Sequence, residues 1–219
     1  MHPYRMAGDL PGVIIYTVNE FTIYLRTGYH HIASLGAWDH VLFVAALTAA
    51  YGPREWKRIA VLVTAFTIGH SVTLALATFN LVHAPARIVE PLIAATIVFT
   101  ALDAIRDQLV PNTESSAHAA RVRRYAIAGC FGLIHGLGFA GGLRALLGAE
   151  SSIAVPLLGF NLGLEFGQLL IVGIIFAVGM AAERWLRLAR RDWVLILAGG
   201  AAGVGLTLLL DRLGSTTGR

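Results

Sequence analysis

Long apolar runs alternate with short polar blocks along the whole chain. A membrane-spanning helix needs about 20 mostly apolar residues. The runs that reach this length, and that we predict to be spanning helices, cover residues 33–51, 58–80, 86–105, 124–148, 153–182 and 193–211. The pattern therefore predicts an all-α polytopic membrane bundle of six transmembrane helices, which forms a single domain over residues 1–219.

Two apolar runs depart from a simple crossing. The 10–25 segment is short and contains polar residues, so we predict an amphipathic helix lying at the membrane interface within residues 1–30. A seventh span is the alternative for this segment. The 153–182 run is too long for a straight crossing, and we expect it to tilt or to break near Gly159 or Gly163.

Composition narrows the class of protein. Hydrophobic residues make up 56% of the chain, charged residues only 14%, and the mean hydropathy is +0.68. A soluble domain is about one-quarter charged, so these values indicate an integral membrane protein. The high pI of 9.6 does not indicate nucleic-acid binding, because the basic residues lie at the ends of apolar runs. The single cysteine, Cys130, excludes an internal disulfide and is predicted to be a small buried side chain. No cleavable signal peptide is evident in the 10–25 segment.

The distribution of Lys and Arg predicts the orientation in the membrane. Eleven of these residues lie in the segments 52–58, 106–123 (with Arg124 at its edge) and 183–192, and six lie elsewhere. Cytoplasmic loops carry the excess of positive charge, so these three segments should be cytoplasmic and both termini should face the periplasm. Within the second segment, residues 111–120 are polar, which predicts a flexible cytoplasmic loop.

Small residues recur at the spacing that allows two helices to pack closely. The repeated glycines are Gly159, Gly163 and Gly167, and again Gly199 and Gly203. The first ridge suits either an internal helix contact or a homo-oligomer. A polar stripe of Asn161, Glu165 and Gln168 lies on the opposite side of the same helix from Gly163, and should therefore face another neighbour.

Ionisable and amide side chains inside the predicted spans are costly in lipid and are usually functional. They are Asp39, His40, His70, Glu90, His135, Asn161, Glu165 and Gln168. With the predicted orientation and a rise of ~1.5 Å per residue, all of them lie between the outer interface and the midplane. We identify no comparable group in the inner half.

Each of these residues also has a structural interpretation. His70 and His135 could be hydrogen-bonded core residues, and Thr67 and Thr73 share a face with His70 and could hold its imidazole. Glu165 could pair with an arginine or bond the backbone, the amides could join helices, and Glu90 could cap its helix. His30, His83 and His118 lie in or near loops and are expected at the surface, and His31 lies at the outer entrance to the Asp39–His40 helix.

Imidazoles and carboxylates at one depth form a plausible first shell for a divalent transition metal such as nickel, cobalt, zinc or copper. The predicted ligands are His31, Asp39, His40, His70, Glu90, His135 and Glu165. The predicted supporting residues are Thr67, Ser71, Thr73, Asn161 and Gln168. The HExxH, CxxC, GxSxG and P-loop signatures are absent, which argues against protease and pump functions.

The chain resembles the HupE/UreJ family of hydrogenase and urease accessory membrane proteins. Five strings in order carry the resemblance: GYHHIASLGAWDHVLF, TAFTIGHSVTLAL, RIVEPLIAATIV, FGLIHGLGFAGGL and LGFNLGLEFGQL. The resemblance implies a small polytopic protein of the bacterial inner membrane that conducts nickel or cobalt for metalloenzyme maturation. The longer spacing from His31 to Asp39, and a single His-Gly pair at His135, indicate a divergent branch.

Three functions remain open at this point. In a permease, the cation would enter past His31 and Glu90 and be caught by the other predicted ligands. In an intramembrane zinc hydrolase with ceramidase-like chemistry, three histidines and a carboxylate would hold the metal, and Glu165 or Asp39 would be the general base. The third function is an accessory scaffold that binds metal or a partner enzyme. The lipids and the metal are the expected partners, and nucleic acid is not.

Overall fold

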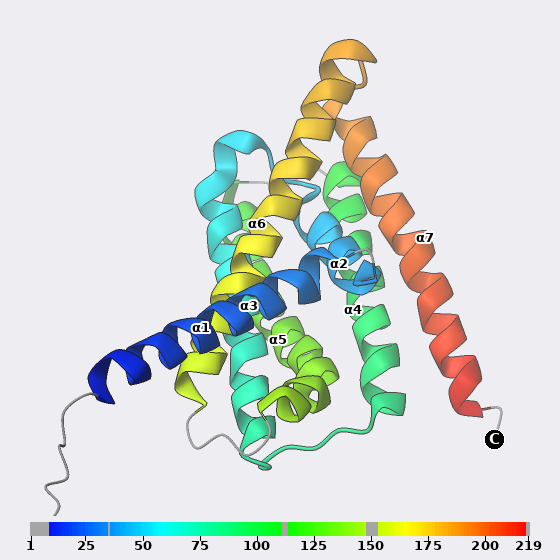
Figure 1. Cartoon of the computed structure of the whole chain (residues 1–219). Helices are drawn as coiled ribbons and strands as arrows, with labels where there is room; N and C mark the ends of the chain where they lie inside the picture. Colours follow the sequence, from blue (N-terminus) through cyan, green and yellow to red (C-terminus); the bar gives the residue numbers. More distant parts are fainter. Residues whose placement is uncertain (1–8, 35, 111–113, 148–152, 218–219) are drawn as a thin grey trace, which may run out of the picture.

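The computed structural model describes residues 9–34, 36–110, 114–147 and 153–217. These residues form α-helices and one 3-10 turn, with no strand among them (Figure 1). The helices are α1 (Asp9–Ala33), α2 (Trp38–Thr48), η1 (Pro53–Glu55), α3 (Trp56–Thr78), α4 (Ala86–Leu109), α5 (Glu114–Leu147), α6 (Ala154–Trp185) and α7 (Arg190–Thr217). The all-α membrane bundle predicted from the sequence is confirmed.

Five helices are long and apolar enough to cross a membrane, namely α3 to α7. The first predicted span, 33–51, is wrong as a continuous helix. The chain bends by 72° between Glu20–Ala33 and Trp38–Thr48, and only this bent pair together has the length of a sixth span. The 11 residues of α2 rise only ~16 Å, about half of the hydrocarbon thickness. A turn interrupts the helix here, and in it the Ala37 amide donates a hydrogen bond to the Ser34 carbonyl. Hydropathy identifies the apolar run but cannot detect such a turn within it.

The N-terminal helix extends further than the predicted 10–25 segment and packs along α6, so it is part of the bundle instead of lying alone at the interface. Glycines allow this close contact. A Cβ atom at Gly163 would lie 1.9 Å from the Leu25 carbonyl oxygen, and one at Gly28 would lie 1.9 Å from the Phe160 oxygen. The ridge of Gly159, Gly163 and Gly167 is therefore buried in an internal contact, which leaves no room for a homo-oligomer at that ridge. The expected break near Gly159 or Gly163 is also absent, because α6 is one helix of 32 residues.

The predicted cytoplasmic loop over 106–123 is mostly helical, which corrects that prediction. Helix α4 continues to Leu109 and α5 begins at Glu114, while residues 111–113 lie outside the described part. Ion pairs explain the extension, because Arg123 and Arg124 on α5 both contact Asp103 on α4.

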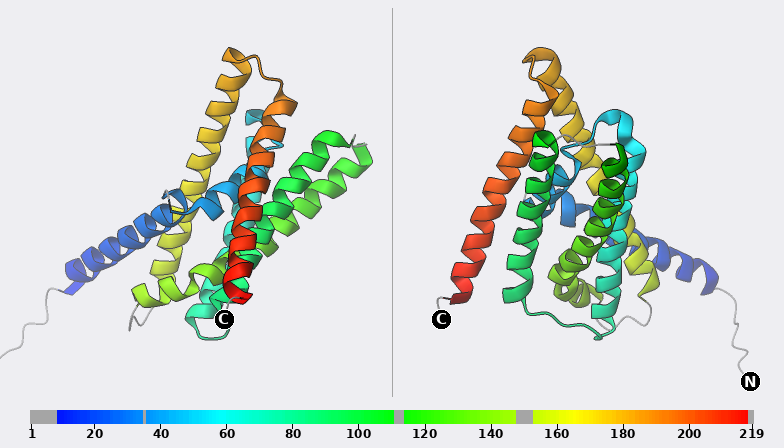
Figure 2. Two further views of the ribbon diagram at one scale, coloured as in Figure 1. Left: turned by 90° about the vertical axis from the view of Figure 1, so that its right-hand side faces the viewer. Right: turned by 180° about the vertical axis from the view of Figure 1, so that it is seen from behind.

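The three arginine-rich connections lie at one end of the bundle, which we call the arginine-rich end (Figures 1 and 2). The turn between α6 and α7, the connection from α2 to α3, and the ends of α4 and α5 all lie toward this end, as the charge pattern predicts. Helices pack mainly as the pairs α3–α5, α1–α6 and α4–α7, with the short α2 between α4, α6 and α7. Cys130 is exposed on the outside of this bundle and not buried as predicted, because its face of α5 points away from the neighbouring helices.

Candidate metal centre

Four helices bring four imidazole rings together inside the bundle. His31 comes from α1, His40 from α2, His70 from α3 and His135 from α5. Ring centroids are 4.7 Å apart for His31 and His40, 5.1 Å for His40 and His135, and 6.0 Å for His31 and His70. We call these four residues the histidine cluster. His40, His70 and His135 are buried and His31 is half-buried.

Three of these histidines are arranged as metal ligands would be. One ligand nitrogen from each of His31, His40 and His70 lies within 4.8 Å of the other two. Three nitrogens bound to one ion at about 2.1 Å lie roughly 3.4 to 3.6 Å apart, so shifts of about 1 Å would bring all three into contact with one ion. Nε2 of His31, Nε2 of His40 and both nitrogens of His70 are buried without a hydrogen-bond partner. Buried polar atoms are normally paired, and these unpaired lone pairs therefore fit a cation.

Asp39 orients one of these ligands. Its Oδ1 accepts a hydrogen bond from Nδ1 of His40 at 3.0 Å and another from the His40 backbone amide at 2.9 Å. This contact assigns the imidazole proton to Nδ1 and leaves the Nε2 lone pair free for an ion. Carboxylate–histidine pairs of this kind fix the ring and raise its basicity in metal sites. Asp39 therefore lies behind a ligand and is not in the three-histidine group.

His135 supplies a fourth nitrogen next to this group. The Thr96 hydroxyl donates to the Ile93 carbonyl at 2.7 Å, so its oxygen accepts from Nε2 of His135 at 2.9 Å. The proton of His135 is then on Nε2, and its Nδ1 keeps a lone pair that is buried and unpaired. Thr96 was not among the residues predicted from the sequence, although it lies on an α4 face with other polar residues.

Phenylalanine rings surround the imidazoles. The Phe139 centroid lies 4.0 Å from that of His31, and Phe160 stacks on His70 at 6.1 Å with an interplanar angle of 13°. Phe43 and Phe66 lie 4.9 and 5.2 Å from His135. These apolar walls limit the water that reaches the imidazole nitrogens, and they restrict ring rotation. A cavity of about 660 Å³ opens to the outside beside His31, between α1 and α5.

The other predicted ligands have different partners. Glu90 pairs with Arg212 on α7, and only a small cavity of about 30 Å³ links it to Asp39. Glu165 accepts a hydrogen bond from the Thr64 hydroxyl at 2.6 Å. Among the described residues, the group with convergent ligand atoms contains neither glutamate. The rotation of each helix about its axis directs the Glu90 carboxylate to Arg212 and the Glu165 carboxylate to Thr64. The depth of a residue in the membrane, which the sequence predicts, does not contain this rotation.

The predicted supporting residues mostly join helices. The Thr67 hydroxyl donates to Gln168 at 3.0 Å, so the polar stripe of α6 faces α3 as expected. The Thr73 hydroxyl donates to the His70 carbonyl at 3.1 Å, so neither threonine holds the His70 imidazole. Ser71 donates to the Thr67 carbonyl at 2.6 Å. Asn161 is half-buried, and its Oδ1 has no partner within the described part of the chain.

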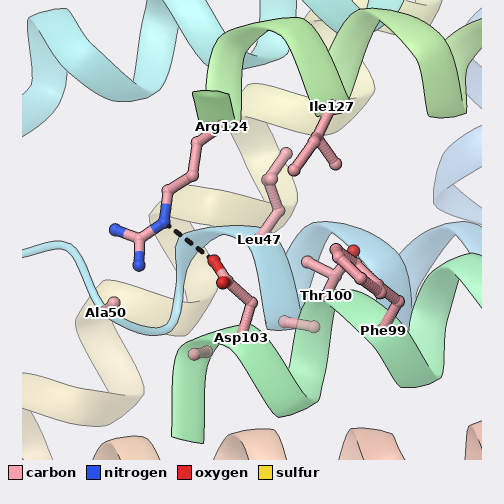
Figure 3. Close-up of a pocket in the computed structure, with 9 residues that line it drawn as sticks. Leu47, Ala50, Phe99, Thr100, Asp103, Arg124 and Ile127 are labelled. Carbon is pink, nitrogen blue, oxygen red and sulfur yellow. Dashed lines mark hydrogen bonds and ion pairs between the residues drawn. The ribbon is translucent and has the colours of Figure 1, made fainter. Parts of the chain in front are cut away.

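The expectation of an inner half without ionisable groups is wrong. Asp103 on α4 is bonded to Arg124 on α5 at 3.1 Å, and their side chains are only 13% and 16% exposed (Figure 3). Asp107 is also paired with Arg124. The sequence carried a signal for these residues, since Thr96, Thr100, Asp103 and Asp107 follow one another at helical spacing. Asp103 and Arg124 lie near the ends of the predicted spans 86–105 and 124–148, where charged residues are expected, so this spacing did not indicate an intramembrane site.

Comparison with known proteins gives one match. A sequence model of the family described as HupE / UreJ protein matches residues 13–210. No curated protein and no solved structure matches the chain. The matched region contains the histidine cluster, Asp39 and the whole of α4.

Proposed function

This chain belongs to the HupE/UreJ family, and we propose that it is a membrane permease for a divalent transition metal that binds at the histidine cluster. The resemblance of its motifs to that family favours nickel or cobalt as the cargo. The observation that carries the proposal is that one ring nitrogen from each of His31, His40 and His70 lies within 4.8 Å of the other two, and that each of these rings also has a buried nitrogen without a hydrogen-bond partner. Ionisable residues at such a depth are costly and mark ion pathways.

The donor chemistry supports a transition metal. Neutral imidazole suits nickel, cobalt, copper and zinc, whereas magnesium and calcium require oxygen ligands. Asp39 contributes one negative charge next to His40, which only partly offsets the two positive charges of the ion. Incomplete compensation in a low-dielectric site keeps binding weak enough for release, as conduction requires.

An approach route and a driving force are both available to a cation. The cavity of about 660 Å³ is lined by His30 and His31 and reaches the histidine cluster beside Phe139. The membrane potential would contribute about 4.6 kcal/mol per 100 mV to inward movement of a divalent ion. The sequence has no nucleotide-binding motif, so we assign the driving force to the ion gradient and this potential.

The zinc hydrolase has less support from the geometry. A general base must lie within hydrogen-bond reach of the metal-bound water. Asp39 is occupied by His40, and Glu165 is bonded to Thr64 on α3. Both predicted bases therefore already accept a hydrogen bond from another side chain, and neither belongs to the convergent three-histidine group.

Metal flux into sealed vesicles tests the permease. The purified protein is reconstituted with an inside-negative potential, and uptake of nickel, cobalt, zinc and copper is measured against empty vesicles. We expect uptake of at least one of these ions that rises with the potential. Tight binding with no uptake above that of empty vesicles would overturn the proposal in favour of a scaffold or an enzyme.

Asp39→Asn is expected to weaken metal binding roughly 10- to 100-fold, as loss of an outer-shell carboxylate does in other metal sites. The amide keeps the size of the side chain but removes the charge behind His40. Isothermal titration with nickel or cobalt measures the affinity. Glu55→Gln is the matched control, because Glu55 pairs with Arg58 at the arginine-rich end, and its affinity should equal that of the wild type. Equal affinity of Asp39→Asn and wild type would show that the Asp39–His40 pair is only structural.

A further inference from the structure

We propose that Arg124, held between Asp103 and Asp107, is the gate through which the cargo cation leaves the histidine cluster toward the arginine-rich end. The inference rests on the proposed permease function and supplies the exit that the sequence did not reveal. It is carried by a polar line on α4, by a half-buried ion pair, and by two cavities that meet at Arg124.

The polar line begins at the histidine cluster. Thr96 contacts His135, and the Thr100 hydroxyl donates to the Thr96 carbonyl one turn later at 2.7 Å. Asp103 and Asp107 continue along the same side of α4 toward the arginine-rich end, since all four positions are three or four residues apart. We call these four residues the α4 stripe. It is a line of side-chain oxygen atoms that leads from the histidine cluster toward the arginine-rich end.

Arg124 closes this line. Its Nε contacts Asp103 at 3.1 Å (Figure 3). A terminal nitrogen of the same guanidinium pairs with Asp107. The Tyr51 ring lies against the same guanidinium, with its centroid 5.9 Å from the central carbon. The two negative charges of the α4 stripe are therefore balanced by Arg124 together with Arg123, and both of these cations belong to α5.

Two cavities meet at this guanidinium. The first lies between α2, α4 and α5, and it is lined by Thr100, Asp103 and Arg124. Its volume is about 20 Å³, which is enough for a single water molecule. The second has about 240 Å³ at the arginine-rich end and is lined by Asp107, Gln108 and again Arg124. Arg124 is thus the charged partition between the interior and the wider cavity.

The charges explain how the partition would open. A divalent cation that reaches Asp103 competes with the guanidinium for the same carboxylate oxygens and repels it. Arg124 then has room to turn into the wider cavity, while Arg123 contacts Asp103 from the exposed side at 2.6 Å and keeps α4 and α5 together. A purely structural ion pair would join the same two helices but would not control access to Thr100.

Cysteine accessibility tests the gate independently of transport. Cys130→Ser removes the single cysteine, and Thr100→Cys then reports on the inner cavity. The full chain in lipid nanodiscs is treated with methanethiosulfonate ethylammonium, and labelling is followed by mass spectrometry. We expect slow labelling when Arg124 is intact and at least tenfold faster labelling after Arg124→Met. An unchanged rate would overturn the proposal.

Control variants show what a change in the labelling rate means. Gln108→Cys in the wider cavity should react quickly with or without Arg124, and Leu102→Cys, 54% exposed on the lipid side of α4, should stay unreactive in both. Arg123→Met removes the exposed partner of Asp103 and should leave labelling of Thr100→Cys slow. Asp103→Asn frees the guanidinium without removing it and should accelerate labelling, which keeps the test decisive if Arg124→Met does not fold. Flux in wild-type vesicles with unaltered labelling would reject only the gate, whereas altered labelling without any flux would reject only the permease.

Discussion

His70→Ala is expected to abolish saturable metal binding and metal flux. His70 is completely buried, and neither of its ring nitrogens has a hydrogen-bond partner in the described structure. Removing it leaves two of the three convergent nitrogens and an apolar cavity. The loss should exceed the roughly 10- to 100-fold that follows loss of an outer-shell partner, because a ligand itself is removed.

The measurement is isothermal titration with nickel, cobalt, zinc and copper, followed by vesicle uptake with the same protein. His83→Ala is the control, since His83 is exposed and bonds Asn80 away from the cluster, and it should bind metal like the wild type. Circular dichroism and size exclusion establish that both variants fold. Wild-type affinity in folded His70→Ala would remove the histidine cluster from the proposed pathway.

Gly132→Ala is expected to lower the stability of the protein strongly. A Cβ atom there would lie 2.1 Å from the Phe66 carbonyl oxygen and 3.0 Å from the His70 amide nitrogen. Both contacts are backbone, so neither can move without separating α3 from α5, and overpacking of this kind costs about 1–3 kcal/mol or more. The separation would also draw His70 away from His135, so metal affinity should fall with the melting temperature.

Gly173→Ala is the matched control, because its Cβ position in α6 has nothing within 4 Å. Alanine is the better helix former by about 1 kcal/mol, so this variant should melt at or slightly above the wild-type temperature. Thermal unfolding followed by size exclusion in one detergent compares the two variants. Equal melting temperatures would mean that α3 and α5 are not packed backbone against backbone at Gly132.

Much of the architecture could be predicted because it depends on quantities that run along the chain. The lengths of the apolar runs predicted the five continuous spans that the structure contains. The arginine-rich segments also lie toward one end of the bundle, as their charge predicted. The rise per residue places His40, His70 and His135 at similar depth whatever their neighbours are. Glycines spaced by four along α6 likewise mark a close helix contact before its partner is known.

The sequence predicted the structure less completely where a helix breaks, and where the rotation of a helix about its axis decides which neighbour a side chain contacts. The break between Ala33 and Trp38 interrupts an apolar run that hydropathy reads as continuous. Glu165 and Glu90 lie at plausible depths, but their helices direct them to Thr64 and Arg212. The helical spacing of Thr96 and Asp103 can be seen in the sequence, but only the tertiary structure shows that they contact His135 and Arg124 on α5.

The sequence by itself determined that this is a helical membrane protein, and it predicted that His40, His70 and His135 lie at similar depth, because composition and helix rise act along a single dimension. Only the tertiary structure decided which lone pairs converge and where the line past Thr100 is closed. Those outcomes depend on the rotation and tilt of each helix, which are set by backbone contacts such as Gly132 with Phe66 and Gly163 with Leu25. Contacts of this kind join residues far apart in the chain, and no local pattern contains them.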